Sequence, residues 1–385
     1  MASGPGAPVD PKHAHFPCPG CSADMKFDPA SGMMMCPFCG RTAAVPASTP
    51  AAATSTAVAT AAPTSLRCHP LEEFLSNAQG AHLAMLTPQS LEVHCGACGS
   101  SVTFQPPEVA GICPFCGSAI VAQPKAADPL VAPDAVLPAK ISKPQAQSEV
   151  KTWLSSRWFA PTALKTMARQ EGINGVYLPF WSYDADTASD YTGQRGEHYY
   201  ETEYYTDSNG RRAERQVQRT RWYPASGHVD VSFHDVLIAA SRSVQEQKLN
   251  ALQPWGLEAL CAYEPGYLAG FKAQRYQVEL ADGYSEAKTV MAGEIEQAAC
   301  RDIGGDEQRV TSVDTAYSNV GFRHLLLPVW IGAYRFQNKA YQVVVNAATG
   351  EVQGERPYSA IKIALLVVAI SILLILFAMM SGGHH

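Results

Sequence analysis

The chain has 385 residues, is 46% hydrophobic and carries a formal net charge of −6. This length and apolar content suffice for one sizeable domain besides smaller modules. The negative balance excludes a general electrostatic attraction to polyanions such as nucleic acid.

Eight of the eleven cysteines form two quartets that share the spacing C-x2-C-x14-C-x2-C and a closing Cys-Pro-Phe-Cys-Gly. Two tight Cys-x-x-Cys turns can place four thiolates about 2.3 Å from one ion, and the intervening residues suffice for a β-hairpin. The pattern predicts two zinc ribbons. Each Zn²⁺ is expected to be structural, because sulfur fills all four positions and leaves none for water. The quartets are Cys18, Cys21, Cys36 and Cys39, then Cys95, Cys98, Cys113 and Cys116.

The first ribbon is expected to have strands at 24–27 and 33–35, and the second to pair 102–104 with Ile112. A disulfide framework is the alternative for these cysteines. It requires an oxidising compartment, and residues 1–16 contain no apolar signal-peptide region. The remaining thiols, Cys68, Cys261 and Cys300, have no evident partner and are interpreted as core residues.

Near the C-terminal end, residues 363–380 carry no charge, and Ser371 is their one polar residue. At 1.5 Å per residue they span about 27 Å, and Lys362 can snorkel so that a transmembrane helix covers 360–380. Arg356 and Lys362 lie on its N-terminal side, whereas the residues after it include no Lys or Arg. The positive-inside rule then predicts a single-pass protein of the inner (cytoplasmic) membrane, anchored C-terminally with its body in the cytoplasm. Whether His384 and His385 are native stays open.

The expected organisation is multidomain α+β. It comprises a first zinc ribbon (1–41), a disordered Ala/Thr/Pro linker (42–65), a short helix plus the second ribbon (66–122), a Pro-rich linker (123–135), an α+β body (136–357) and the transmembrane helix (360–380).

Within the body, one helix is expected from Ser142 to near Arg157 and another from about Tyr284 to Arg301, stopped by two glycines. Each is followed by a strand with Leu-Pro-x-Trp, at 178–181 and 327–330, and then by a tyrosine. This order suggests two repeated α+β units packed together, with a chance match of four letters as the alternative. Proline inside both strands favours sheet edges or bulges.

A hairpin around Asp207-Ser208-Asn209-Gly210 carries aromatic and arginine side chains on its two strands. With Asn209 and Gly210 as a two-residue loop, one face would pair Tyr204 with Arg215, Tyr200 with Arg219, and His198 with Arg221. Such a ribbon could grip a phosphate backbone or stack bases. Alternatively the groups satisfy one another, since five acidic residues lie in the same hairpin.

Other chemical signals are weak. Asp184, Asp186 and Asp190 are expected on one side of a strand, where they could bind a hard metal ion. The alternative is that they are solvent-exposed and hydrated, as acidic strand residues usually are. The phosphate-binding, zinc-protease and serine-hydrolase motifs are absent from the sequence, so no enzyme is predicted. The ribbons themselves are poor in Lys and Arg, which argues against nucleic acid as their ligand.

Four segments resemble a bacterial family of membrane-anchored zinc-ribbon proteins: Tyr-Leu-Pro-Phe-Trp-Ser-Tyr-Asp (177–184), Arg-Thr-Arg-Trp-Tyr-Pro-Ala-Ser-Gly (219–227), Asp-Ile-Gly-Gly-Asp (302–306) and Leu-Pro-Val-Trp (327–330). Members are often labelled replication-restart or primosomal helicase-like, yet the ATPase motifs of such a helicase are missing here. The resemblance implies a link to phage-shock-type membrane-stress systems and a flotillin-like (SPFH) partner.

Taken together, these signals predict a non-enzymatic, membrane-anchored adaptor that recruits a protein partner at the cytoplasmic face of the membrane. The alternative is a membrane-tethered nucleic-acid-binding protein associated with replication, in which Arg215, Arg219, Arg221, Tyr200 and Tyr204 contact the nucleic acid. The sequence leaves the oligomeric state and the separate role of the first ribbon open.

Overall fold

The computed structural model describes residues 16–46, 68–76, 83–84, 91–95, 99–104, 110–115, 119–121, 125–126, 130–157, 172–206, 210–336, 339–355 and 360–381. The described chain is predominantly β-sheet. The predicted α+β class is therefore wrong. The segments expected as strands belong to much longer strands. The helices therefore pack against one large sheet and do not form separate α+β units with it.

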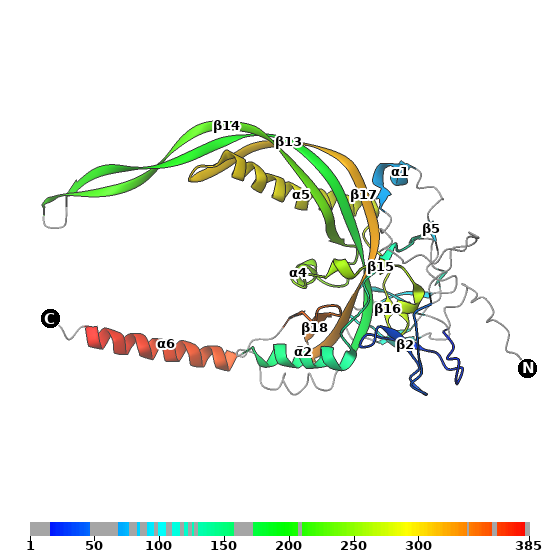
Figure 1. The fold of residues 1–385 in the computed structure, drawn as a ribbon. Coiled ribbons are helices and arrows are strands. Elements are labelled where there is room, and N and C mark those ends of the chain that lie inside the picture. The colour runs from blue at the N-terminus through cyan, green and yellow to red at the C-terminus, as the bar shows by residue number, and fades with distance from the viewer. Residues whose placement is uncertain are drawn as a thin grey trace, which may run out of the picture.

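The sheet is built on three long strands, β13 (Ile173–Thr206), β14 (Arg212–Ala239) and β17 (Glu307–Phe336), in the order β14-β13-β17. They bend together into an arch (Figure 1). Short strands complete it around the lower part of β13 and β17: β4 (His69–Pro70), β12 (Ala135–Val136), β15 (Cys261–Ala262), β16 (Lys272–Ala273), β18 (Lys339–Asn346) and β19 (Val352–Gly354).

The two Leu-Pro-x-Trp segments lie side by side in this one sheet. They pair antiparallel, with Leu178 opposite Leu327 and Pro179 opposite Leu326. The two helix-and-strand units expected from the sequence thus share one sheet through these strands. Each proline lies in an inner strand, one residue beyond the paired stretch of a neighbour: β14 pairing ends at Phe180 and β18 pairing ends at Val329. The proline carbonyls accept bonds on that side, from Ala240 N to Pro179 O (3.0 Å) and from Ala347 N to Pro328 O (3.0 Å).

The tryptophans of the two segments each hold the start of a helix. Trp181 Nε1 donates to Val278 O (2.9 Å), just ahead of α5 (Leu280–Ile303). Trp330 Nε1 donates to Ile141 O (2.8 Å), just ahead of α2 (Lys143–Ser155). Because α2 precedes β13 in the chain and α5 precedes β17, each tryptophan fixes the helix that leads into the other strand.

Helix α2 forms where the sequence predicts it, and Ser142 N donates to Gln145 Oε1 (2.8 Å) in the expected capping arrangement. Helix α5 begins four residues before the predicted Tyr284 and ends at Gly304, which has φ 63°. Its buried residues recur every fourth position and face the inner side of the arch (Figure 1). A Cβ at Gly283 would lie 2.7 Å from Trp181, so only glycine permits this close approach.

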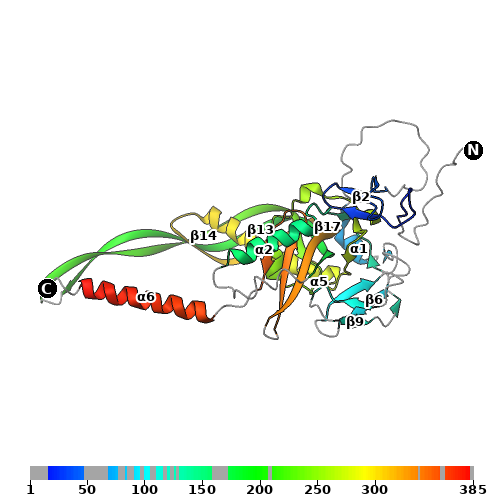
Figure 2. The ribbon, with the colours of Figure 1, turned by 90° about the horizontal axis from the view of Figure 1, so that it is seen from below.

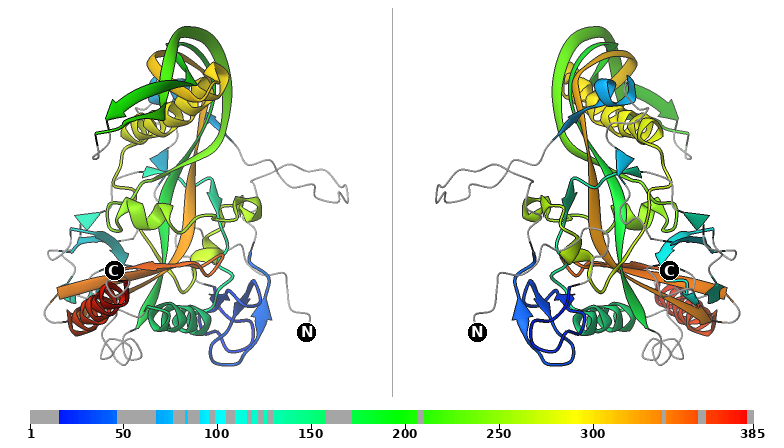
Figure 3. Two further views of the ribbon diagram at one scale, coloured as in Figure 1. Left: turned by 90° about the vertical axis from the view of Figure 1, so that its left-hand side faces the viewer. Right: turned by 90° about the vertical axis from the view of Figure 1, so that its right-hand side faces the viewer.

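The shorter helices are α1 (Leu71–Ser76), α4 (Glu246–Asn250), η1 (Leu257–Ala259) and η2 (Pro265–Leu268). The first ribbon contains β1 (Lys26–Asp28), β2 (Met33–Met35) and β3 (Thr42–Ala43), close to the predicted hairpin, and lies beside α2 (Figure 3). Most of the predicted 42–65 linker lies outside the described residues.

The second ribbon pairs differently from the prediction. Strand β7 (Ser101–Phe104) pairs with β6 (Leu91–His94), and β8 (Ala110–Ile112) pairs with β9 (Ala119–Val121). The 102–104 segment therefore bonds to the strand before its Cys-x-x-Cys turn instead of to Ile112. The remaining strands here are β5 (Leu83–Ala84), β10 (Lys125–Ala126) and β11 (Leu130–Val131).

Helix α6 (Ala360–Ser381) covers the segment predicted to span a membrane. In the described part of the chain, however, no helix is both long and apolar enough to cross a bilayer. The predicted transmembrane helix at 360–380, and with it the single-pass anchoring in the inner membrane, is therefore wrong.

Beyond the body, β13 and β14 continue as a two-stranded hairpin, which we call the arm (197–206 and 212–221). Strand β17 begins at Glu307, opposite Gly196, so the arm has no third strand. Figures 1 and 2 both show it projecting past the end of α5.

Candidate metal centre

The first cysteine quartet comes together as the sequence predicts. The sulfurs of Cys18, Cys21, Cys36 and Cys39 all lie within 4.8 Å of one another. Cys18 Sγ and Cys39 Sγ are 3.4 Å apart, and Cys21 Sγ is 3.5 Å from Cys36 Sγ and 3.7 Å from Cys39 Sγ. Four sulfurs held tetrahedrally about 2.3 Å from one ion would be about 3.8 Å apart. The quartet therefore fits a tetrahedral metal ion.

Both turns of this quartet have the same backbone design. Ser22 N donates to Cys18 O (2.8 Å) and Gly40 N donates to Cys36 O (3.0 Å). Ser22 and Gly40 both have positive φ, 59° and 70°. In such a tight turn, the backbone N–H groups of the residues after the first cysteine point toward the sulfur of that cysteine.

These amides favour the thiolate form that a metal requires. Gly20 N donates to Cys18 Sγ (3.4 Å), and this amide, helped by that of Cys21, lowers the pKa of Cys18 to about 6. The amides of Cys39 and Phe38 likewise hold the pKa of Cys36 below its ordinary value. The first cysteine of each turn is thus prepared for deprotonation by the fold itself.

The first cysteine quartet packs against the body with one side and is exposed to solvent on the other. Cys18 and Cys36 are buried, whereas Cys21 and Cys39 are exposed. Phe27 N donates to Ala269 O (2.9 Å), and the Phe27 ring packs edge-on to Tyr267 with centroids 5.3 Å apart. The inner cysteines share a hydrophobic cluster with Trp330. The ribbon is thereby fixed to the end of β17.

The second quartet is described in part. Cys95 and Cys113 are buried, and Cys98 and Cys116 lie outside the described residues. The Cys95 turn repeats the design of the first quartet, because Gly99 N donates to Cys95 O (2.8 Å) and Gly99 has φ 72°. Ser100 Oγ lies 3.4 Å from Cys113 Sγ.

The phenylalanines of the two Cys-Pro-Phe-Cys-Gly segments have opposite environments. Phe115 is 4% exposed and lies in the main core cluster with Leu327 and Trp255. Its carbonyl accepts a hydrogen bond from Gln342 Nε2 (3.2 Å). Phe38, at the same position of the first segment, is 82% exposed.

The three other cysteines are not the core residues predicted, because Cys68 is exposed and Cys261 and Cys300 are half-buried. Partial burial and the carboxylate of Asp184, 3.5 Å from its sulfur, raise the pKa of Cys68 to about 11. Burial also raises the pKa of Cys261, whose sulfur donates to Val136 O (3.4 Å). Cys300 is half-buried on α5.

The arm residues proposed for nucleic acid are displaced by one position from the predicted register. The last strand pair is Thr206 with Arg212, so the connection is longer than the two-residue loop assumed. Arg215 then lies opposite Glu203, Arg219 opposite Tyr199 and Arg221 opposite Glu197. A one-residue shift moves every side chain to the other face. Tyr200 and Tyr204 consequently lie opposite Gln218 and Glu214, on the face away from these arginines.

The arginines have acidic and aromatic neighbours. Arg215 pairs with Glu203 (2.9 Å), and Arg219 pairs with Glu201 (2.7 Å) and Glu203 (2.5 Å). Arg221 lies 4.9 Å over the Tyr199 ring. The arrangement matches the alternative in which these groups satisfy one another.

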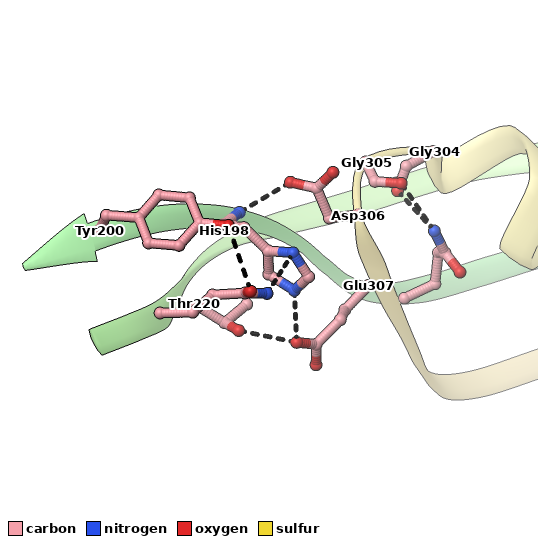
Figure 4. A network of polar contacts seen from close by, with 9 residues as sticks. His198, Tyr200, Thr220, Gly304, Gly305, Asp306 and Glu307 are labelled. Carbon is pink, nitrogen blue, oxygen red and sulfur yellow. Dashed lines mark hydrogen bonds and ion pairs between the residues drawn. The ribbon is translucent and has the colours of Figure 1, made fainter. Parts of the chain in front are cut away.

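Sequence reasoning missed a polar joint at the base of the arm (Figure 4). His198 N donates to Asp306 Oδ2 (2.7 Å), His198 Nε2 lies 2.8 Å from Glu307 Oε1, and the Thr220 hydroxyl donates to the same oxygen (2.7 Å). Donation from Thr220, then from His198, keeps the pKa of Glu307 below its ordinary value. Gly304 and Gly305 indicated the turn before Asp306. No nearby residue indicated that Asp306 accepts a hydrogen bond from His198.

The three aspartates considered for a cation are each engaged separately. Asp184 pairs with Arg323 (2.6 Å), Asp186 accepts from Ser232 (2.7 Å), and Asp190 lies 2.7 Å from a histidine nitrogen. Among the residues that the structure describes, only the first cysteine quartet groups His, Cys, Asp or Glu closely enough to hold a metal ion.

Comparison with known proteins gives little further information. No family model matches the sequence, and no solved structure is similar to it. The chain is similar to the uncharacterized protein YdjG of Bacillus subtilis (strain 168), with 25% identity over 260 residues that cover 66% of this chain and 73% of the relative.

Proposed function

We propose that the protein is a non-enzymatic adaptor whose first zinc ribbon binds a protein partner through Phe38. The observation that carries the proposal is the contrast between two identical pentapeptides. One phenylalanine is 4% exposed and docked in the body, and the other is 82% exposed. A rigid metal-bound turn that presents an aromatic ring to solvent has the character of an interface anchor.

Both quartets hold structural Zn²⁺ in this proposal. Four cysteine thiolates with tetrahedral spacing are the donor set of structural zinc. The backbone design of the Cys95 turn, which repeats that of the Cys18 and Cys36 turns, supports a second site completed by Cys98 and Cys116. A metal closed by four sulfurs offers no position to substrate, which supports a binding role over a catalytic one.

The resemblance noted from the sequence suggests a flotillin-like (SPFH) protein as the partner class, in a membrane-stress response. The first ribbon suits a protein ligand better than nucleic acid, because Lys26 and Arg41 are the only Lys or Arg residues from Cys18 to Arg41 and Asp24 and Asp28 offset them.

The test compares Phe38→Ala with Phe115→Ala in the full chain. Both remove the same ring from the same pentapeptide. Phe38→Ala should retain two zinc ions per chain and wild-type thermal unfolding, yet lose binding to a purified flotillin-like protein in sedimentation or calorimetry. Binding by Phe38→Ala at wild-type affinity would refute the role of this residue.

The nucleic-acid alternative keeps a specific test of its own. The exposed tyrosines and arginines of the arm favour it, whereas the pairing of Arg215 and Arg219 with Glu201 and Glu203 leaves fewer charges for phosphates. Under this alternative, the Arg215→Ala/Arg219→Ala variant should bind single-stranded DNA more weakly than wild type at low salt. Unchanged binding, or none by wild type, would dispose of it.

A further inference from the structure

The arm is exposed to solvent along its whole length. No residue of 197–206 or of 212–221 is buried. Strand β14 ends the order of the sheet, and β17 stops pairing with β13 at Gly196, so within the described chain both edges of the arm are free. A two-stranded hairpin with two open faces is marginally stable in water.

The arm lacks two of the features that block strand addition, proline and β-bulges, and one amide of its β13 edge, that of His198, already binds Asp306. Its twenty residues include no proline, no lysine and no glycine. Strand pairing runs without a bulge from Ala185 opposite Phe233 to Thr206 opposite Arg212. Regular edges with unpaired backbone groups are templates for another strand.

The two edges have opposite charge. The β13 side of the arm contains three acidic residues and no Lys or Arg, whereas the β14 side contains four arginines and one glutamate. Two β13 edges or two β14 edges would bring like charges together, but a β13 edge beside a β14 edge would attract. These residues are Glu197, Glu201 and Glu203 on β13, and Arg212, Glu214, Arg215, Arg219 and Arg221 on β14.

We propose that the arm binds the arm of a second copy of this chain, head to tail, with the β14 edge of one copy against the β13 edge of the next. The added strand would be parallel to β14, so that the two arms point in opposite directions. The bodies then lie at opposite ends of the overlap and β17, which occupies the β13 edge from Gly196 onward, does not block it. With the arms fully overlapped, Glu201 and Glu203 of the second copy would lie beside the segment of β14 that contains Arg215 and Arg219. Such a heterologous contact repeats from copy to copy and gives a ring or a filament.

Aromatic residues complete this interface. Tyr199, Tyr200, Tyr204 and Tyr205 are 36%, 67%, 62% and 46% exposed. They are distributed over both faces of the arm, so a neighbouring strand would pack against tyrosines on either side. Tyrosine and arginine together are enriched at protein interfaces.

The experiment uses three variants of the full chain. The acidic variant, Arg215→Glu/Arg219→Glu, makes the β14 edge resemble the β13 edge. The basic variant, Glu201→Arg/Glu203→Arg, does the reverse. The exchanged variant combines all four substitutions and so keeps the ion pairs within the hairpin, which protects it against a loss of folding.

Sedimentation velocity and hydrogen exchange of the 197–221 peptides provide the two readouts. Wild type should sediment as an oligomer, and the acidic and basic variants should each sediment near the 41.4 kDa of one chain with faster exchange in the arm. Mixing those two variants should restore both the oligomer and the protection. The exchanged variant should assemble with itself but not with wild type, because their unlike edges no longer match.

A matched control reverses two charges elsewhere. Lys143→Glu/Lys151→Glu on the exposed side of α2 changes net charge as much as the acidic variant does and should leave assembly unchanged. The proposal is overturned by monomeric wild type, by acidic and basic variants that assemble like wild type, or by free mixing of the exchanged variant with wild type.

Discussion

The two cysteine ribbons share a spacing and a pentapeptide, but they pack against the body in different ways. In the second ribbon, Cys113 and Phe115 lie in the same core cluster as Leu327 of the long strand β17. In the first, the metal-binding turn packs only its inner cysteines against the body, and Phe38 faces solvent. A motif that determines the geometry of a metal site therefore does not determine which of its side chains are available for binding.

The difference has its origin in the contacts of each turn and not in the cysteines. The first cysteine of the turn is buried in every described case, Cys18 and Cys36 in the first quartet and Cys95 and Cys113 in the second. In the second ribbon, Gln342 of β18 donates to Phe115 O and draws that turn inward. The first ribbon is consequently the one that has an aromatic anchor to offer.

Removal of a metal ligand should have the largest effect on both ribbons. Structural zinc contributes about 10–16 kcal/mol to the folding of small zinc domains. Cys36→Ser and Cys95→Ser should each lower the zinc content by one ion per chain. We expect both substitutions to destabilise the body as well, because Cys36 and Cys95 each lie in a hydrophobic cluster with body residues. The loss should be larger for Cys95→Ser, since the second ribbon also places Phe115 in the core. Metal analysis with denaturant unfolding checks both. A Cys95→Ser variant that keeps two ions would show that the second quartet is not a zinc site.

Truncation of the two phenylalanines sharpens the comparison. Removing a buried phenylalanine side chain costs about 3–5 kcal/mol, whereas an exposed one changes stability by about 0.5 kcal/mol or less. Phe115→Ala should therefore lower the free energy of unfolding by several kcal/mol, and Phe38→Ala should leave it within error. Urea unfolding followed by tryptophan fluorescence measures both values. Equal losses would mean that Phe38 is covered in solution.

Local signals in the sequence were sufficient for features that are determined locally. The Cys-x-x-Cys spacing located the first metal site, and the capping residues Ser142 and Gln145 located α2. Helix α5 was placed correctly except for its first turn, because Glu279 and not Asp282 precedes its first residue. In each of these cases the interacting groups lie close together in the chain or follow a fixed spacing.

Features that depend on distant partners were not predictable in the same way. Nothing near Pro179 or Pro328 indicates that the two proline-containing strands are neighbours, because this pairing joins residues about 150 positions apart. The register of the arm depended on an assumed turn length, and an error of one residue exchanged its faces. The burial of Phe115 depends on Gln342, far along the chain.

The hydrogen bond that draws the second ribbon inward should have a smaller effect than its phenylalanine. Gln342→Leu removes the donor to Phe115 O (3.2 Å) and to Ser243 O (3.4 Å) and introduces an apolar side chain of similar size. A net loss of about 1–2 kcal/mol is expected from these bonds. Urea unfolding should show this loss while metal analysis still gives two zinc ions per chain. Hydrogen exchange should be faster around 110–115 and unchanged in the first ribbon. Faster exchange in both ribbons would instead indicate a general loss of the sheet.

The joint at the base of the arm is held by direct contacts of a carboxylate with an imidazole and a hydroxyl, so it should respond to protons, whereas the ribbons should respond to chelators. Donation from Thr220 and His198 lowers the pKa of Glu307 in the folded state. A carboxylate whose pKa is lowered on folding stabilises the folded state at a pH above its ordinary pKa of about 4.5. That contribution is lost as the pH falls through the lowered pKa. In wild type, the hydrogen-exchange protection of the 197–206 amides, corrected for intrinsic exchange, should therefore decrease slightly when the pH is lowered below about 4.5.

Glu307→Gln supplies the matched control for this joint, since its amide cannot be titrated. Protection of the arm in this variant should be lower than in wild type at neutral pH and should show a smaller step on acidification. A step remains because Glu203, whose pKa Arg215 and Arg219 hold below its ordinary value, still titrates. A chelator at neutral pH should strip the ribbons and leave the joint intact, because His198, Thr220 and Glu307 make contact without a metal. Loss of arm protection on chelation would mean that the ribbons and the arm unfold as one unit, and the independence assumed between them would fail.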